Sequence, residues 1–374
     1  MFYIGGVGLA FFLTLLLVSK RKKTGADKIL SSWLFLITTH LLFFYFWKTG
    51  LYPRLLGIAI PFPLMHGPLL YLYTLALTNR TQSLRASSLH FIPSFAVFIY
   101  LIPFLGLPVD QKISVYKNNG AGFETFNLVM TIAIIISGVL YVVLSSLVLR
   151  KHRIFIADQF SNTEKINLKR LQYLIYWIGV IWILVIIDND EWVFGATVLF
   201  IAFIGFFGIR QVGIFHSPEV FLPTRSTPGE MDEKTVEPQK VSVEERRKYQ
   251  KSGLSPESSE ILHRQLTQVM TDEKLYRNSE LSLADLAVRL NTQPNYLSQM
   301  LNELDGKNFY DYVNSLRIEE FKRLIAIPDN RKYTLQALSQ QCGFNSKSSF
   351  NRYFKKVTGQ SPSEFMEAVC DSEN

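Results

Sequence analysis

Residues 282–306, "SLADLAVRLNTQPNYLSQMLNELDG", and residues 334–359, "TLQALSQQCGFNSKSSFNRYFKKVTG", carry the same pattern twice. Up to the turn the apolar positions of the first copy return 52 residues later, so that Leu283, Leu286 and Leu290 correspond to Leu335, Leu338 and Cys342. Beyond the turn the offset is 53, so that Leu297, Leu301 and Gly306 correspond to Phe350, Phe354 and Gly359. The unit therefore repeats with one extra residue in its turn.

Each copy predicts two short helices joined by a tight turn. In the first copy Ser282 is a helix cap, and the apolar stripe that follows it consists of Leu283, Leu286, Ala287 and Leu290. After the break at residues 291–295, the second helix has a predicted buried face of Leu297, Met300, Leu301 and Leu304. In the second copy Thr334 and Ser346 are the caps and Gly343 permits the turn. Such a helix-turn-helix places its second helix in the DNA major groove.

Two longer stretches of the sequence resemble those of a known protein family. Residues 343–365, "GFNSKSSFNRYFKKVTGQSPSEF", resemble the signature of the AraC/XylS class of bacterial transcription regulators, which have two such motifs joined by a long helix. Residues 308–325, "NFYDYVNSLRIEEFKRLI", resemble that joining helix, with an apolar stripe of Phe309, Tyr312, Val313 and Leu316. The resemblance covers roughly the last 120 residues. It implies binding to double-stranded promoter DNA.

Composition separates the chain into unlike parts. Of 374 residues, 48% are hydrophobic and only 19% charged, and the apolar excess lies in the first part. The net charge is +8, yet residues 1–215 hold 18 Lys and Arg against 8 Asp and Glu, and the remainder holds 21 against 23. The expected DNA-binding part is therefore basic only locally, at Arg331, Lys332, Lys347, Arg352, Lys355 and Lys356. Cys342 and Cys370 lack metal-ligand spacing, so no metal site or cofactor is expected.

Residues 1–215 predict a transmembrane domain with about seven spans, each near the length that crosses a hydrocarbon core of roughly 30 Å. The predicted spans are Phe2–Val18, Ile29–Trp47, Gly57–Leu77, Leu89–Leu107, Thr125–Leu149, Leu171–Ile187 and Trp192–Ile209. Fourteen Lys and Arg fall in the loops of one side and four in those of the other. The excess of basic residues predicts a multi-pass protein of the bacterial inner membrane, with its N-terminus outside and its C-terminus in the cytoplasm.

One predicted span holds a candidate ligand site. The run "PFPLMHGPLLYLY" contains three prolines, which free backbone groups and kink a helix, and a site for a small, fairly apolar ligand near Pro61, Pro63 and His66 is one hypothesis. A packing kink is the alternative interpretation. The longest outer loop, residues 108–124, is too short to bury a core of its own, so any signal is expected to be sensed within the helices or from the lipid.

A linker and a soluble domain follow. Residues 216–253 are rich in Pro, Ser, Thr, Lys and Glu and predict a cytoplasmic tether whose ends lie on the order of 35 Å apart. Residues 254–374 predict the double helix-turn-helix domain, entered by a helix with Ser255 as its cap, Pro256 in its first turn and a buried stripe of Ile261, Leu262, Leu266 and Val269.

Thirteen polar side chains are the candidate DNA contacts. In the first motif they are Gln293, Asn295, Ser298, Gln299 and Asn302, and in the second Asn345, Ser346, Lys347, Ser348, Asn351, Arg352, Lys355 and Lys356. Uncharged amides suit adenine, and the planar fork of Arg352 suits the two acceptors of guanine.

The sequence thus predicts an all-α, membrane-bound one-component transcriptional regulator. Its expected partners are promoter DNA and the lipid bilayer, and a second copy of the chain and RNA polymerase are further candidates. No catalytic constellation is present, so no enzyme activity is expected. Two alternatives stay open. The chain is a membrane transporter or enzyme with an autoregulatory DNA-binding tail, or the spans are only an anchor.

Overall fold

The computed structural model describes residues 2–371 except Thr81, Asn119, residues 165–167, Asp188 and residues 211–254. The chain divides into two compact units, the first made of residues 1–152 and 168–220 and the second of residues 153–167 and 221–374. Within the described residues every regular element is a helix, which confirms the all-α prediction, and the one β-bridge joins Phe160 to Ser282. The tether predicted at residues 216–253 lies outside the described residues.

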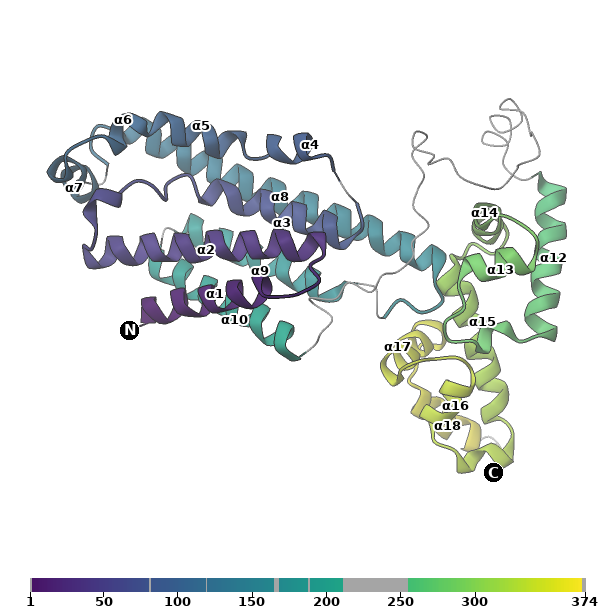
Figure 1. The fold of residues 1–374 in the computed structure, drawn as a ribbon. Helices are drawn as coiled ribbons and strands as arrows, with labels where there is room; N and C mark the ends of the chain where they lie inside the picture. The colour runs from purple at the N-terminus through teal and green to yellow at the C-terminus, as the bar shows by residue number, and fades with distance from the viewer. Residues whose placement is uncertain are drawn as a thin grey trace. The chain divides into compact units, whose positions relative to one another are not determined.

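The first unit is a bundle of long helices with short ones beside it (Figure 1). Helix α2 shows why such helices form where they do. Thr24 caps it by accepting a hydrogen bond from the backbone N–H of Asp27, and the Asp27 carboxylate accepts one from the backbone N–H of Thr24. Gly50, at φ 70°, ends it. The elements are α1 (Phe2–Val18), α2 (Gly25–Thr49), η1 (Pro53–Leu55), α3 (Pro63–Leu77), α4 (Leu84–Leu89), α5 (Ile92–Tyr100), α6 (Ile102–Leu105), α7 (Val109–Lys117), α8 (Glu124–Gln159), α9 (Lys169–Ile186) and α10 (Asp190–Arg210).

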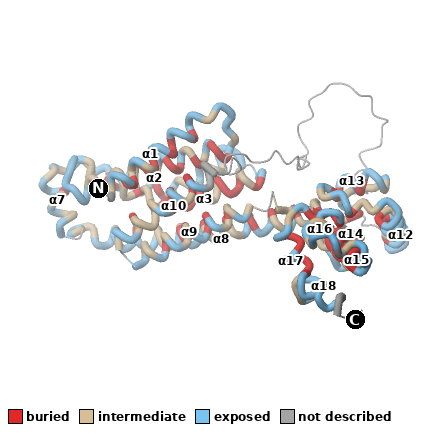
Figure 2. Tube along the Cα trace, turned by 90° about the horizontal axis from the view of Figure 1, so that it is seen from below, coloured by how far each residue is buried: buried red, intermediate tan, exposed pale blue. Residues whose placement is uncertain are grey.

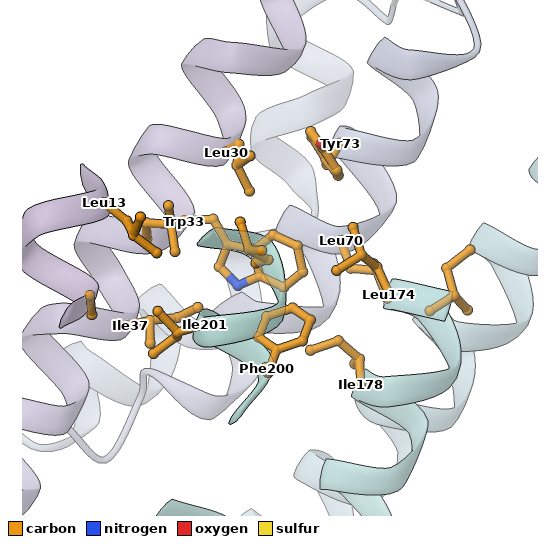
Figure 3. Packing of buried hydrophobic residues seen from close by; sticks show 14 of the residues in the cluster. Leu13, Leu30, Trp33, Ile37, Leu70, Tyr73, Leu174, Ile178, Phe200 and Ile201 are labelled. Atoms are coloured by element: carbon orange, nitrogen blue, oxygen red, sulfur yellow. The ribbon is translucent and has the colours of Figure 1, made fainter. Parts of the chain in front are cut away.

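Aromatic and aliphatic side chains from α1, α2, α3, α9 and α10 meet in one core (Figure 3). Trp33 is 1% exposed and its ring centre lies 5.9 Å from that of Phe200, which is fully buried. Leu70 and Ile178 close the same cluster from α3 and α9. These contacts hold α2 against α3. They thereby position the polar side chains that lie between the two helices.

The prediction of seven spans is wrong for the described residues. Three described helices are long and apolar enough to cross a membrane, namely α2, α8 and α9, and α1 is a shorter apolar helix. The predicted span Gly57–Leu77 is a series of turns followed by the 15 residues of α3, or about 22 Å of helix. The predicted span Leu89–Leu107 is divided into α5 and α6, with Pro93 and Pro103 in their first turns. Proline has no backbone N–H to donate to the preceding turn, and Pro93 and Pro103 accordingly lie at helix starts, whereas Pro68 lies inside α3.

The second unit contains residues 153–167 together with the C-terminal helices. As expected, Ser255 caps α12, and Pro256 is its first residue. The stripe expected on this helix is partly wrong: Leu262, Leu266 and Met270 are buried, but Ile261 is 51% exposed, because the buried face is rotated by one position. The elements are α12 (Pro256–Asp272), η2 (Leu275–Arg277), α13 (Leu283–Arg289), α14 (Pro294–Leu304), α15 (Phe309–Ile325), η3 (Pro328–Lys332), α16 (Leu335–Gln341), α17 (Lys347–Thr358) and α18 (Pro362–Asp371).

Helix α15 takes part in two separate cores of the second unit. Phe309, Tyr312 and Val313 pack with α12, α13 and α14. Ile318 and Phe321 belong to a second cluster with α16 and α17. Figure 2 shows that buried segments, in red, gather around α14, α15 and α16. Because each core lies between α15 and one copy of the repeat, this one helix joins the two copies.

Candidate DNA-binding surface and helix-bundle cavity

The first copy of the repeat forms a helix-turn-helix from α13 and α14. The Ser282 hydroxyl accepts a hydrogen bond from the backbone N–H of Asp285 at 3.2 Å and begins α13. Asn291, with φ at 50°, turns the chain, and Pro294 starts α14. Leu297 and Leu301 are fully buried, as predicted.

One member of that predicted buried face is misplaced. Leu304 is 47% exposed. It is the last residue of α14, two positions before Gly306 turns the chain toward α15, and so it lies beyond the packed part of the helix.

The second copy repeats these features in α16 and α17. Thr334 caps α16 and Ser346 caps α17, each accepting a hydrogen bond from the backbone N–H three residues ahead. Gly343 makes the turn with φ at 100°, a conformation that side chains disfavour. Gly359 ends α17 with φ at 81°, as its counterpart Gly306 follows α14 with φ at 62°. The structure thus has the same helix, turn and glycine twice.

The predicted contacts of the first motif lie outside the core. Gln293, Asn295 and Asn302 are exposed, and Ser298 and Gln299 are half-buried. Two of the amides already have local partners. Gln299 Nε2 donates to Glu303 Oε1 at 2.8 Å, and Asn302 Nδ2 donates to the Ser298 carbonyl at 2.9 Å. Reading a base would require these amides to exchange local hydrogen bonds for bonds to DNA.

The predicted contacts of the second motif follow one exposed side of α17. Ser346 is half-buried, and the other seven, Asn345, Lys347, Ser348, Asn351, Arg352, Lys355 and Lys356, are exposed. Lys356 is not free, because its Nζ lies 2.7 Å from Asp311 Oδ1 on α15. The part of the chain that the structure describes offers no ion-pair partner to Lys347, Arg352 or Lys355. Lys347 and Arg352 are therefore available to an external anion, and so is Lys355, which has an electrostatic interaction with Glu364 but no ion pair with it.

A cavity of about 250 Å³ lies in the first unit between α2, α3, α9 and α10. Its wall includes Pro63 and His66, two of the three predicted ligand residues, along with Trp33 and His40. The third, Pro61, is outside the wall, and its carbonyl accepts a hydrogen bond from Ser94 Oγ at 2.9 Å. Ligand binding by these residues stays a prediction.

A chain of hydrogen bonds borders this cavity. Trp33 Nε1 donates to His66 Nδ1 at 3.2 Å, and His66 Nε2 lies 3.0 Å from His40 Nδ1. Indole N–H is only a donor, so His66 Nδ1 is an acceptor and the proton of that ring is on Nε2. His66 then donates to His40, whose own proton is on Nε2. No described residue accepts that last N–H.

Comparison with known proteins decides what the repeated unit is. The family described as "Helix-turn-helix domain" matches residues 286–368. The chain carries a helix-turn-helix domain. This match begins within the first copy of the repeat, includes the joining helix and the whole second copy, and supports the AraC-type resemblance of the C-terminal part.

Known relatives resemble the chain in this helix-turn-helix domain. An uncharacterized HTH-type transcriptional regulator of Bacillus subtilis (strain 168), YobQ, is 37% identical over 82 residues, which is 22% of this chain and 33% of that protein. Another from Staphylococcus aureus (strain COL) is 31% identical over 100 residues, 27% of this chain and 13% of its own length. The chain thus covers a third or less of these relatives. No solved structure matches it significantly.

A buried charge cluster supports the helix-turn-helix domain and was not foreseen from the sequence. The Glu320 side chain is 5% exposed and accepts hydrogen bonds from Arg323 Nε at 2.8 Å and from the Arg277 guanidinium. The bond from Arg323 is the main cause that lowers the pKa of Glu320 to about 2. Arg277 and Glu320 are 43 residues apart, and no local pattern in the sequence links them.

Proposed function

We propose that this chain is a membrane-bound, one-component transcriptional regulator that binds promoter DNA sequence-specifically through its two helix-turn-helix motifs. The observation that carries the proposal is the exposed side of α17, where Lys347, Arg352 and Lys355 have no ion-pair partner among the described residues. Unpaired cations at a recognition helix are what phosphate and guanine contacts require. The polar side of α14 supports a second reading helix.

The test is a binding-site selection with the full-length protein in lipid nanodiscs. We expect it to recover one sequence with two short conserved elements, since two helices read the DNA. Arg352→Ala should change the recovered sequence at one base position. Glu257→Gln, an exposed change on α12, is the control and should recover the original site. Recovery of random sequence by the wild-type protein would contradict the proposal.

The membrane part of the proposal rests on the outer surface of the first unit. Helix α8 carries a row of large apolar side chains that are each 46–62% exposed. They are Leu128, Val129, Ile132, Ile136, Val139, Leu140, Val143 and Leu147. A water-soluble protein rarely leaves so continuous an apolar surface uncovered, whereas lipid would cover it. This surface supports the membrane location, and binding to DNA would require the C-terminal domain to lie in the cytoplasm.

Reporter fusions test that orientation. Alkaline phosphatase is active only outside the cytoplasm, so a fusion after Asn374 should be inactive and a fluorescent protein at the same position should be bright. Extraction of the protein from membranes by alkaline carbonate would instead contradict membrane insertion.

We further propose that the cavity beside His66 binds the signal. Its wall is mainly apolar, with Asn189, Asp190 and Thr197 as polar residues beside the histidines. The hydrogen-bond chain from Trp33 ends in an N–H on His40 that lacks a described partner. A ligand with an apolar body and one hydrogen-bond acceptor, such as a carbonyl or carboxylate, fits both features. Binding there would change how the tethered DNA-binding domains of two copies are presented, which alters their effective concentration at paired sites.

The experiment is native mass spectrometry of the protein purified with its own lipids. We expect a co-purifying molecule of this class in the wild type and a loss of it in His66→Ala. His90→Ala is the matched control, because His90 contacts Tyr141 at 2.9 Å and is outside the cavity wall. Unchanged promoter output for His66→Ala in all growth conditions would leave the first unit as an anchor.

A further inference from the structure

A short segment that follows α8 lies on the helix-turn-helix domain. Residues 153–167 belong to the second unit although residues 168–220, which belong to the first unit, separate them from the rest of it. Phe160 forms an antiparallel bridge with Ser282, the cap of α13. The backbone N–H and the hydroxyl of Ser161 both donate to the Leu281 carbonyl, at 3.2 and 2.7 Å. We call residues 160–164 the docking segment.

Side chains of α15 hold the docking segment from the other side. Arg317 is 1% exposed, and its Nη1 and Nη2 donate to the carbonyl and hydroxyl of Ser161 at 3.3 and 3.1 Å. Asn314 Nδ2 donates to the same carbonyl at 3.1 Å. Burial lowers the pKa of Arg317 to about 10. Ser161 therefore supplies two of the acceptors of this buried guanidinium, and the carbonyls of Tyr276 and Asn278 supply others.

The far end of the docking segment reaches the second recognition helix. Glu164 Oε1 accepts a hydrogen bond from the hydroxyl of Ser346, the cap of α17, at 2.8 Å, and lies 3.5 Å from the hydroxyl of Ser348. The N-terminus of a helix has unpaired N–H groups and a partial positive charge, which attract an anion. Glu164 therefore supplies a negative charge at the end of α17 that a DNA duplex would approach.

We propose that the docking segment is an inhibitory surface contact, in which Glu164 competes with DNA for the N-terminus of α17. This inference rests on the proposed DNA binding. A recognition helix enters the major groove with its N-terminal residues toward the bases. Glu164 and a DNA duplex therefore exclude each other at Ser346 and Ser348. Release of the segment is then the step that permits binding, and α8, the helix that leads into the segment, is the element that could withdraw it.

The first test is Glu164→Gln in the full-length protein in nanodiscs. The substitution removes the charge and keeps the shape, and we expect about tenfold tighter binding to the selected DNA site. Glu257→Gln removes one charge from an exposed position of α12 and should leave the affinity unchanged. Equal or weaker binding by Glu164→Gln, while Arg352→Ala still loses affinity, overturns the inhibitory contact but leaves DNA binding intact. If neither the wild type nor Glu164→Gln binds DNA, both proposals fall.

A reversible cross-link gives a second, independent test. Opposed residues of an antiparallel bridge have Cα atoms about 4.5–5.5 Å apart, within the range that a disulfide spans. The double variant Phe160→Cys/Ser282→Cys should therefore close a disulfide on oxidation and hold the segment in place. We expect DNA binding at least tenfold weaker when oxidised than when reduced, with the reduced form of the same protein as control. Equal affinities, or failure of the pair to oxidise, would overturn the proposal.

Discussion

Asn291 and Gly343 occupy the same turn in the two copies of the repeat, 52 positions apart, and both have a positive φ, at 50° and 100°. Their surroundings differ. A Cβ atom at Gly343 would lie 2.5 Å from the Tyr276 carbonyl oxygen and 2.8 Å from that of Arg277. The first turn accepts a side chain, and the second one has no room for it.

Gly343→Ala should therefore destabilise the helix-turn-helix domain by about 2 kcal/mol or more, from backbone strain and the clash together. Asn291→Gly should change stability by only a few tenths of a kcal/mol, because glycine adopts a positive φ freely. All five tryptophans lie between positions 33 and 192, so their fluorescence does not report on this domain. Hydrogen exchange of peptides from α13 to α17 measures the difference. Equal protection in both variants would contradict it.

Arg352 should contribute to sequence-specific DNA binding, and Lys356 to binding that does not depend on the DNA sequence. Arg352→Ala should cost about 1–3 kcal/mol on the specific site and relax the preference at one base position. Lys356→Ala should weaken specific and random DNA alike, and by less than a free lysine would, because Lys356 Nζ is 2.7 Å from Asp311. Fluorescence anisotropy with both kinds of duplex checks this. Equal losses on specific and random DNA for both variants would refute the division of roles.

The side-chain amides of α14 should determine which DNA bases the protein prefers. They should contribute little to its electrostatic attraction to the DNA phosphates. Replacing Gln299 and Asn302 together by alanine should alter the selected bases and leave the dependence of affinity on salt almost unchanged, since neither side chain neutralises a phosphate. Site selection and salt titration measure the two effects. Recovery of the original site by the double variant would make α14 a support only.

Glu320 should make the domain sensitive to acid. Its pKa is lowered from 4.5 to about 2 in the folded protein, mainly by the hydrogen bond from Arg323. A depressed pKa adds stability that is fully present above pH 4.5 and is lost as the pH falls toward 2. Glu320→Gln should hence be less stable than wild type at neutral pH, and the difference should shrink below pH 4.5.

Acid titration followed by far-UV circular dichroism compares the two proteins. Glu319→Gln is the matched control, because the adjacent Glu319 side chain is 64% exposed. A constant difference between Glu320→Gln and wild type from pH 7 to pH 3 would refute the assignment.

Local features of the fold followed from the sequence. Ser282, Thr334 and Ser346 were predicted as caps from residue type and spacing, and each caps its helix. The glycines Gly306 and Gly359, which the repeat pairs, both have a positive φ. A cap and a turn depend on neighbours within a few residues, so the sequence contains all that decides them.

Features that depend on distant partners did not follow from the sequence. Ile261 and Leu304 fit an apolar period, but exposure is decided by which helix covers them. Prolines start new helices within the predicted span Leu89–Leu107, which hydropathy alone predicts as one continuous helix. Arg317 contacts Ser161 from 156 positions away, and Lys356 contacts Asp311 from 45. No spacing within a single stretch reveals such pairs.

Helix α15 supplies side chains to both cores of the helix-turn-helix domain. One residue inserted near Asn314 would turn everything beyond it by about 100° and shift it by about 1.5 Å. The second motif would then meet a different side of the double helix. On the proposed DNA binding, the length of α15, 17 residues, therefore sets the number of base pairs between the two promoter elements. If the chain binds promoters as proposed, we expect those promoters to keep that interval constant, even where their bases diverge.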